Sequence, residues 1–104
     1  MSFKFEKLII WQKSMDLGEV IFQMSKDFQK DEMFNLASQI RRAVDSIALN
    51  ISEGSILQST PEFKRFLGFS IRSLAEVVTC LYKAKIENIF QKINSKDYIT
   101  NRIN

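Results

Sequence analysis

Between residues 31 and 54 the sequence repeats apolar residues at the spacing of an α-helix. At about 100° per residue, positions three, four and seven apart share one face, and such a face is usually buried. The apolar face of this segment consists of Leu36, Ile40, Ala43, Ile47 and Ile51. The pattern predicts a helix that begins near Asp31 and ends at Glu53, with Gly54 following as a left-handed terminating residue.

A row of polar residues lies beside that apolar face, within an arc of about 80°. It consists of Gln39, Arg42, Ser46, Asn50 and Glu53. A second polar row, on the helix expected to follow, consists of Arg65, Arg72, Glu76 and Lys83. If the two rows meet, the arginines pair with Glu53 and Glu76 in a partly buried network. Such a network has two interpretations: it holds helices or subunits in register, or it binds a ligand.

The first segment predicts a helix from about residue 6 or 7 to Lys26, with two apolar stripes that cover about half of its circumference. One stripe consists of Leu8, Trp11, Met15, Gly18 and Phe22, and the other of Ile10, Leu17, Ile21, Met24 and Phe28. A short connection at 29–31 makes the first two helices antiparallel neighbours. Two explanations of the second stripe follow: a small bundle buries this helix deeply, or the stripe mediates self-association.

The third helix has a clear start signal. Ser59 and Glu62 have the spacing of a capping box, and Thr60 before Pro61 is the alternative cap. Gly68, on the flank of this helix, is expected to allow the close approach of another helix. The residues expected in the core seam are Phe63, Phe66, Leu67, Ser70, Leu74, Val77, Leu81 and Ala84, with Cys80 packing at the edge.

After the third helix we expect a loop near residues 90–94 and a short fourth helix at 96–103, capped by Ser95. The sequence therefore predicts an all-α fold, in which residues 1–104 form one domain. Its architecture is an antiparallel up-and-down four-helix bundle with a short or truncated fourth helix. Either the last helix is truncated, or the other three close around it. The missing turns would leave apolar surface on the first and third helices uncovered, which favours oligomerisation.

Composition narrows the possible functions. With 15 Lys and Arg against 12 Asp and Glu, the net charge of +3 is compatible with a nucleic-acid partner without requiring one. The chain has no His, one Cys and three scattered Gly, so we expect no His-based catalytic or metal site and no glycine-rich phosphate loop. We predict that the protein is not an enzyme and takes no metal or cofactor. We see no signal peptide or membrane span in the sequence, which favours a cytoplasmic location.

Three motifs carry a resemblance to a known family. The central one is Leu36-x-x-Gln39-Ile40-Arg41-Arg42-Ala43-x-x-Ser46-Ile47-x-x-Asn50-Ile51-x-Glu53-Gly54. It is flanked by Phe5-Glu6-Lys7-Leu8-x-x-Trp11-Gln12-Lys13 and by Phe63-x-x-Phe66-Leu67-x-x-Ser70-x-x-Ser73-Leu74-Ala75-Glu76. Together they resemble the four-helix-bundle family named for 23S rRNA intervening sequences. The resemblance implies a ring-shaped homopentamer and an RNA or DNA partner.

Basic side chains are the candidate nucleic-acid contacts. They are Arg41, Arg42, Lys64, Arg65 and Arg72, with Gln39, Ser46, Asn50, Glu53 and Glu76 as the polar network that orients them or forms an interface. Phe69 lies beside Arg65 and Arg72, where its ring stacks on a base or fills a subunit contact. The expected function is a non-enzymatic homo-oligomer that binds nucleic acid. The alternative is a structural or protein-interaction module, and the salt dependence of binding distinguishes the two.

Overall fold

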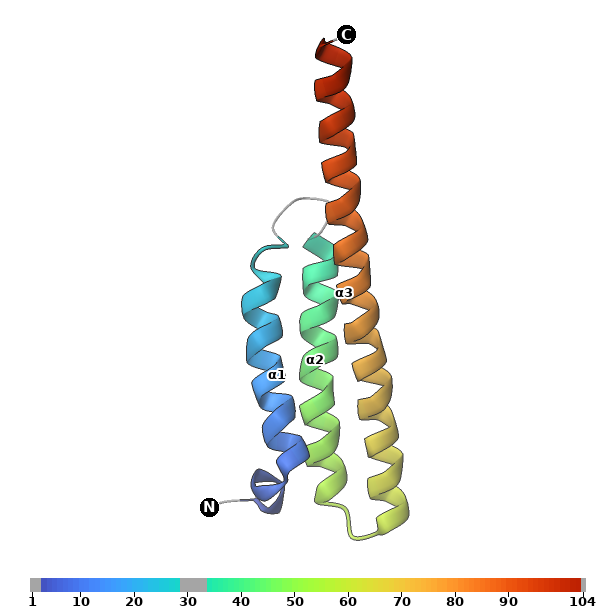
Figure 1. The fold of residues 1–104 in the computed structure, drawn as a ribbon. Helices are drawn as coiled ribbons and strands as arrows, with labels where there is room; N and C mark the ends of the chain where they lie inside the picture. Colours follow the sequence, from blue (N-terminus) through green and yellow to red (C-terminus); the bar gives the residue numbers. More distant parts are fainter. Residues whose placement is uncertain (1–2, 29–33, 104) are drawn as a thin grey trace.

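The computed structural model describes residues 3–28 and 34–103 and folds them almost entirely into helices (Figure 1). A short 3₁₀-helix, η1, spans Lys4–Lys7 and leads into α1, Ile9–Ser25. Two longer helices follow: α2, Phe34–Ser55, and α3, Thr60–Ile103. These described residues contain no strand, so the expected all-α class is confirmed. The predicted connection at 29–31, with its cap, lies outside the described residues.

The central helix is α2, which lies between α1 and α3 and packs against both (Figure 1). Its apolar face is buried as expected, and the exposed fraction of Ile40 is 0%. Ile21 of α1 and Val77 of α3 join the same core and are almost completely buried. Burying a side chain of this size stabilises a fold by about 1.5–3 kcal/mol. The other two helices therefore depend on α2 for their cores.

Gly54 does not end α2 in a left-handed conformation, and that prediction is wrong. The helix continues to Ser55, and no glycine among the described residues has a positive φ. A Cβ atom placed on Gly54 would lie 2.6 Å from the Cβ of Phe66, so this glycine allows α3 to approach α2 closely. We expected Gly68 to have that role, but a Cβ atom there would meet no other atom within 4 Å.

The start of α3 follows the capping-box prediction. The backbone N–H of Glu62 donates to Ser59 Oγ at 3.3 Å, which satisfies one of the unpaired amides of the first turn. Pro61 lies in that turn, where its missing N–H loses no intrahelical hydrogen bond.

The predicted loop near residues 90–94 is not present, because α3 continues through it to Ile103. No Gly or Pro occurs between Phe69 and Ile103, so nothing in this stretch interrupts the helical hydrogen bonds. The residues expected as a separate fourth helix, 96–103, form the last turns of α3. Over residues 3–28 and 34–103 there are thus three α-helices, and the four-helix bundle is not confirmed.

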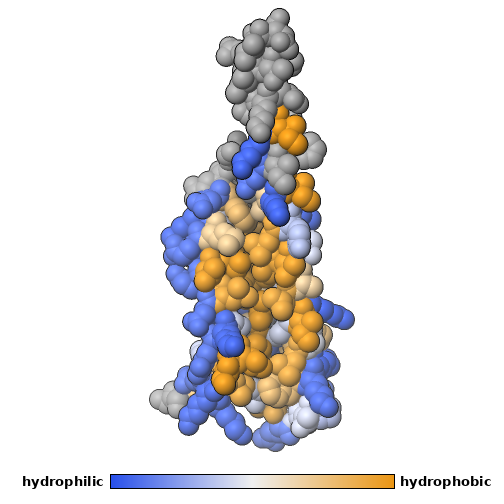
Figure 2. Space-filling view, viewed as in Figure 1, coloured by the Kyte–Doolittle hydropathy of each residue, from blue (hydrophilic) through white to orange (hydrophobic). Residues whose placement is uncertain are grey.

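Apolar side chains of α1 and α3 remain exposed, and Figure 2 shows an apolar face that extends over the bundle. The exposed members of the two α1 stripes, between 42% and 50% accessible, are Ile10, Met15, Phe22 and Met24. The deep-burial explanation of these stripes is therefore wrong. On α3, Leu74 was expected in the core but is 43% exposed. Despite this apolar surface, none of the helices within the described ranges is both long and apolar enough to cross a membrane.

Replacing Gly54 with Ala should destabilise the protein, because the new methyl group would overlap with Phe66. Overpacking of this kind costs about 1–3 kcal/mol. Chemical denaturation should therefore show a free energy of unfolding that is lower by this amount. Gly68→Ala is the matched control, since its methyl group meets no atom and removing a helical glycine adds about 0.5–1 kcal/mol of stability. Equal stability of the two variants would contradict the close contact.

Candidate functional site

The two polar rows meet where α2 packs on α3. Ser73 Oγ donates to Ser46 Oγ at 2.9 Å, and Gln39 Nε2 donates to Glu76 Oε1 at 3.2 Å. Asn50 Nδ2 donates to the backbone carbonyl and to the hydroxyl of Ser46, both at 2.9 Å. Among the described residues, the contact found between the predicted rows is that of Gln39 with Glu76, whereas Ser46 bonds Ser73, which was not in the predicted second row.

A buried hydrogen bond continues the same line of contacts. Ser70 Oγ donates to the backbone carbonyl of Ile47 at 2.9 Å, and Ser70 is only 5% exposed. We refer to the whole set as the polar seam. It consists of Gln39, Ser46, Asn50, Ser70, Ser73 and Glu76.

Hydrogen bonds of serine and amide side chains, one of them to the Glu76 carboxylate, hold this seam together in place of the predicted ion pairs. The ion pair found within the described ranges joins Arg65 to Glu62 on the outside of α3, at 2.9 Å. Arg42 Nη1 donates to Ser38 Oγ on its own helix at 3.1 Å, and Glu53 is exposed. Serine side chains are short and bring the two helices close together. The longer arginine side chains therefore lie at the edge of the contact, where water solvates them.

Arg41 connects α2 to α1. Its Nε donates to Ser25 Oγ at 2.6 Å, and its guanidinium lies 4.7 Å from the ring centroid of Phe22. Because Ser25 is buried, this arginine has a packing role in addition to its charge. Arg41 and Arg42 also line a hollow of about 510 Å³, together with Asp45.

A cluster of basic and aromatic side chains lies on the first four turns of α3. The guanidinium groups of Arg65 and Arg72 each lie 5.7 Å from the ring centroid of Phe69. Phe66 meets Phe69 edge to face, with centroids 5.5 Å apart. The predicted proximity of Phe69 to both arginines is confirmed. We call Arg65, Phe69 and Arg72 the arginine–aromatic cluster.

The five predicted phosphate contacts lie on two neighbouring helices, Arg41 and Arg42 on α2 and the other three on α3. Lys64 and Arg65 lie near the end of α2 that contains Gly54, since Phe66 packs there. Arg72 lies further along α3, because its neighbour Ser73 bonds Ser46, which is only one turn, about 6 Å, from Arg42 along α2. The structure thus brings Arg65 and Arg72 together around Phe69, with Arg42 on the neighbouring helix and Arg41 directed to α1.

Comparison with known proteins identifies the family. The family model of the 23S rRNA-intervening sequence protein matches residues 6–103. The chain belongs to this family. The match covers α1 to α3 and confirms the resemblance inferred from the sequence motifs. No curated protein matches the chain.

In this member of the family, the polar motif residues of α2 are largely engaged in helix packing. Ser46 and Asn50 make their hydrogen bonds inside the polar seam, and Gln39 spans the two helices. The interpretation of the row as a structural network accounts for these contacts. Arg42 and Glu53 stay at its edge, where they are exposed.

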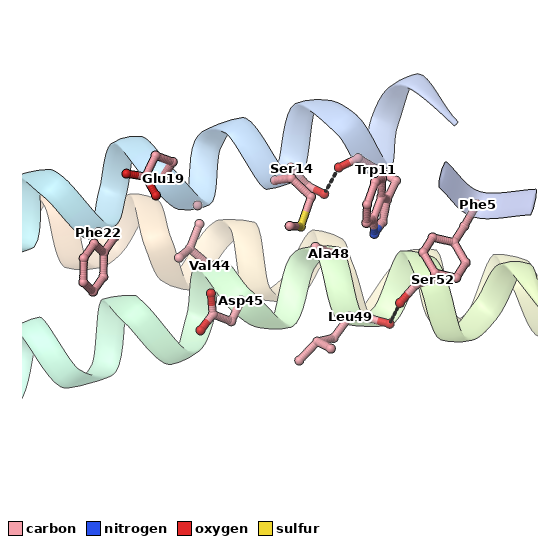
Figure 3. Close-up of a pocket in the computed structure, with 12 residues that line it drawn as sticks. Phe5, Trp11, Ser14, Glu19, Phe22, Val44, Asp45, Ala48, Leu49 and Ser52 are labelled. Carbon is pink, nitrogen blue, oxygen red and sulfur yellow. Dashed lines mark hydrogen bonds between the residues drawn. The ribbon is translucent and has the colours of Figure 1, made fainter. Parts of the chain in front are cut away.

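An apolar groove between α1 and α2 was not predicted from the sequence (Figure 3). Its volume is about 710 Å³, and its walls include Trp11, Phe22 and Leu49. The ring of Trp11 meets that of Phe5 edge to face, at 5.2 Å between centroids. Trp11 is half-buried: it packs against the core and also lines the groove. The α1 stripe that contains Trp11 and Phe22 was the available signal, but the sequence did not show that a groove would separate it from α2.

Cys80 is a packing residue, as predicted. It is 1% exposed, and burial raises the pKa of its thiol, with a further increase from the negative charge of Glu76. The thiolate is therefore disfavoured at neutral pH, and the thiol is a poor nucleophile. Among the residues that the structure describes, no three His, Cys, Asp or Glu side chains lie close enough to hold a metal ion.

The contact between Ser46 and Ser73 should appear as coupling in a double-mutant cycle. Each single Ala variant leaves one hydroxyl without its partner across the helices, whereas the double variant leaves none. We expect a coupling energy of about 0.5–1.5 kcal/mol from urea denaturation. The control pair is Ser46 with Ser52, whose hydroxyl bonds the carbonyl of Leu49 in its own helix and should give additive effects. Additive effects for Ser46 and Ser73 would show that the polar seam contributes no coupling.

Proposed function

We propose that the protein binds the phosphate backbone of RNA or DNA as a homo-oligomer, without catalysing a reaction. The observation that carries the proposal is the arginine–aromatic cluster, in which two guanidinium groups flank one half-exposed ring. Guanidinium groups bind phosphate with two parallel hydrogen bonds. An aromatic ring beside them provides a surface on which an unpaired base stacks. The cluster therefore offers contacts to both parts of a nucleotide.

The partners of the two arginines in the structure leave them able to bind phosphate. Arg65 is paired with Glu62, but the side chains are 58% and 47% exposed, and pairs this exposed contribute little. Arg72 is exposed and contacts the ring of Phe69. Lys64 adds a third positive charge on the adjacent turn. Arg42 adds a further exposed positive charge from α2, one turn from Ser46, which bonds Ser73 beside Arg72.

The apolar face supports the self-association in this proposal. Arg72 is two residues from Leu74, and Arg42 is two residues from Ile40, so each arginine lies about 160° around its helix from an apolar residue. Nucleic acid and a second copy would thus occupy opposite sides of the bundle. A helix seated on the apolar side would complete the four-helix bundle. The ring of five copies that the resemblance implies remains a prediction, tested by light scattering.

The second candidate is a protein-interaction module, and the exposed apolar side chains favour it. In that case the polar rows and apolar face together form the contact with a partner protein. The salt dependence of binding distinguishes the two candidate functions. Phosphate contacts release counterions, so binding to nucleic acid weakens as the salt concentration rises. Apolar contacts do not show this dependence.

Replacing Arg72 with Ala should weaken RNA binding by about tenfold or more, because a charge-assisted hydrogen bond contributes about 1.5–3 kcal/mol. The slope of log K against log salt should also become less steep, by about one unit for each lost phosphate contact. We would measure both by fluorescence anisotropy with a labelled single-stranded RNA, at about 50 and 200 mM salt. Arg65→Ala should behave in the same way.

The matched control is Lys13→Ala, which removes an exposed positive charge from α1, away from the cluster. It should lower the affinity much less than Arg72→Ala. Phe69→Leu keeps apolar bulk but removes the stacking surface, and should weaken binding to single strands by about 1–3 kcal/mol. Binding that is absent, or that is unaffected by salt and by Arg72→Ala, would refute the nucleic-acid proposal.

A further inference from the structure

Two helical glycines, Gly18 of α1 and Gly68 of α3, have no packing role within the chain. A Cβ atom placed on either glycine would meet no other atom within 4 Å. A glycine inside a helix costs about 0.5–1 kcal/mol relative to alanine, a cost that a close approach of another backbone or side chain explains. Gly54 has such a contact, with Phe66 of the same chain. At Gly18 and Gly68 the surface is open to the approach of a further helix.

Each of these glycines belongs to a series of four residues with the same spacing. The α1 wall of the apolar groove carries one series, with one aromatic ring at each end (Figure 3): Trp11, Met15, Gly18 and Phe22. The outer side of α3 carries the other, whose members are exposed or half-exposed: Lys64, Gly68, Ile71 and Ala75. Ile71 is 67% exposed and Met15 is 50% exposed. A large residue in one series faces a small one in the other at three of the four positions, which is how helices interdigitate.

The two series lie at the same height along the bundle, since each α3 member follows its α1 counterpart by 53 residues. Ser25 of α1 bonds Arg41 of α2, and Ser73 of α3 bonds Ser46 of α2. Because α2 is antiparallel to α1, Ser46 is level with Val20, and Ser73 follows Val20 by the same 53 residues. The helices α1 and α3 also run in the same direction (Figure 1).

We propose that α3 of one copy packs its series into the α1–α2 groove of the next copy, so that the copies associate head to tail. The inference rests on the self-association in the proposed function and specifies which side chains meet. Because the two series are level and parallel, neighbouring copies are related by rotation about an axis parallel to the helices. The contact uses a different surface of each copy, so it permits rings with an odd number of copies.

Apolar side chains of each copy fill the spaces beside the glycines of the other. Ile71 packs against Gly18, and Met15 packs against Gly68. Methionine is flexible, so Met15 accommodates the single methyl group of Gly68→Ala. At the end of the series the aliphatic stem of Lys64 covers Trp11, while its ammonium group stays in water.

Charges on the two surfaces are complementary. Asp45 lies on the α2 wall of the groove, and Arg72 of the incoming α3 lies on the edge that faces this wall. The two are level, because the residues that follow them in sequence bond each other between α2 and α3. Within the described ranges Arg41 and Arg42, which share a hollow with Asp45, each donate to a serine. Glu19, the other carboxylate of the groove, is exposed and accepts a hydrogen bond on its own helix.

The contact leaves the surface for nucleic acid uncovered. Phe69 and Arg65 lie about 160° and 120° around α3 from Ile71, so they face away from the groove. Arg72 lies between the two surfaces. Its guanidinium has five N–H donors, so an ion pair with Asp45 leaves donors for a phosphate.

A size swap between Gly18 and Ile71 tests the contact. Gly18→Leu should exclude the incoming Ile71 from the groove, so light scattering should give the single-chain mass of 12.1 kDa at a concentration where the parent is assembled. Adding Ile71→Ala to Gly18→Leu should restore the parent mass. Val20→Leu is the matched control, because Val20 is exposed on α1 outside the groove, and it should leave the mass unchanged. Circular dichroism checks that each variant stays helical.

Three results would overturn the contact. The first is a parent that has the mass of one chain. The second is a Gly18→Leu variant that assembles as fully as Val20→Leu. The third is a double variant whose mass is not restored, since that result would exclude the pairing of Gly18 with Ile71.

Cross-linking provides an independent test that adds no bulk to the groove. We would introduce Met15→Cys and Gly68→Cys together in a Cys80→Ala background and add a short bis-maleimide reagent. Each chain then has one cysteine on each surface, so a denaturing gel should show a ladder of covalent oligomers. An equal mixture of the two single variants should stop at covalent dimers, and either single variant alone should give none.

The ladder distinguishes a head-to-tail contact from the alternatives. Covalent dimers as the final product of the double variant would indicate a two-fold contact and overturn the proposal. Single chains that are linked internally would also overturn it, as would a yield no higher than that of the single variants.

Adding RNA separates this inference from the proposed function. A ladder that binds no RNA would refute only the nucleic-acid contacts. RNA binding by an assembled parent that forms no ladder and does not respond to the size swap would refute only the head-to-tail contact. Arg65→Ala lies outside the contact, so it should weaken RNA binding without changing the mass of the assembly.

Discussion

The close contact between α2 and α3 is the constraint on which the other features of the molecule depend. At one end Gly54 leaves room for Phe66, and further along the helices meet through serines. Small side chains let two backbones approach, but each buried hydroxyl then needs a partner. Moving α3 by one turn would separate Ser73 from Ser46 and leave a hydroxyl unpaired, at a cost of about 1–3 kcal/mol. Packing and hydrogen bonding thus select the same register.

That register also determines how α3 is rotated about its own axis. Ser70 and Ser73 must face α2, so the positions that precede and follow them face elsewhere. Arg65 and Arg72 are seven residues apart and share one outer side, whereas Leu74 lies on the other. One set of contacts therefore produces a basic side and an apolar side on the same helix. It also leaves α1 in contact mainly with α2, which is why apolar side chains of α1 and α3 stay exposed.

Local periodicity was sufficient to predict several of these features. The buried face of α2, the Ser59 cap and the buried Cys80 follow from spacing and residue type, and the structure confirms them. Gly54 was misinterpreted because a glycine near a helix end usually terminates it, and only the position of Phe66 shows its packing role. The faces of the two helices that carry polar residues were predicted, but the hydrogen bonds between them depend on how closely the helices approach. Residue spacing along the sequence does not give that distance. The meeting of Arg65 and Arg72 around Phe69 was predictable because all three lie on one helix.

The continuation of α3 past Asn88 was not predicted, because the residues of this stretch have only weak local preferences. Asn and Ser in this stretch favour a break by only a fraction of a kcal/mol each, and no Gly or Pro adds to them. Whether such a helix bends back or stays straight then depends on which apolar surface it can reach. A bent chain covers its own exposed apolar side chains but loses helical hydrogen bonds at the bend. A straight helix keeps those bonds and needs a neighbour for its apolar residues.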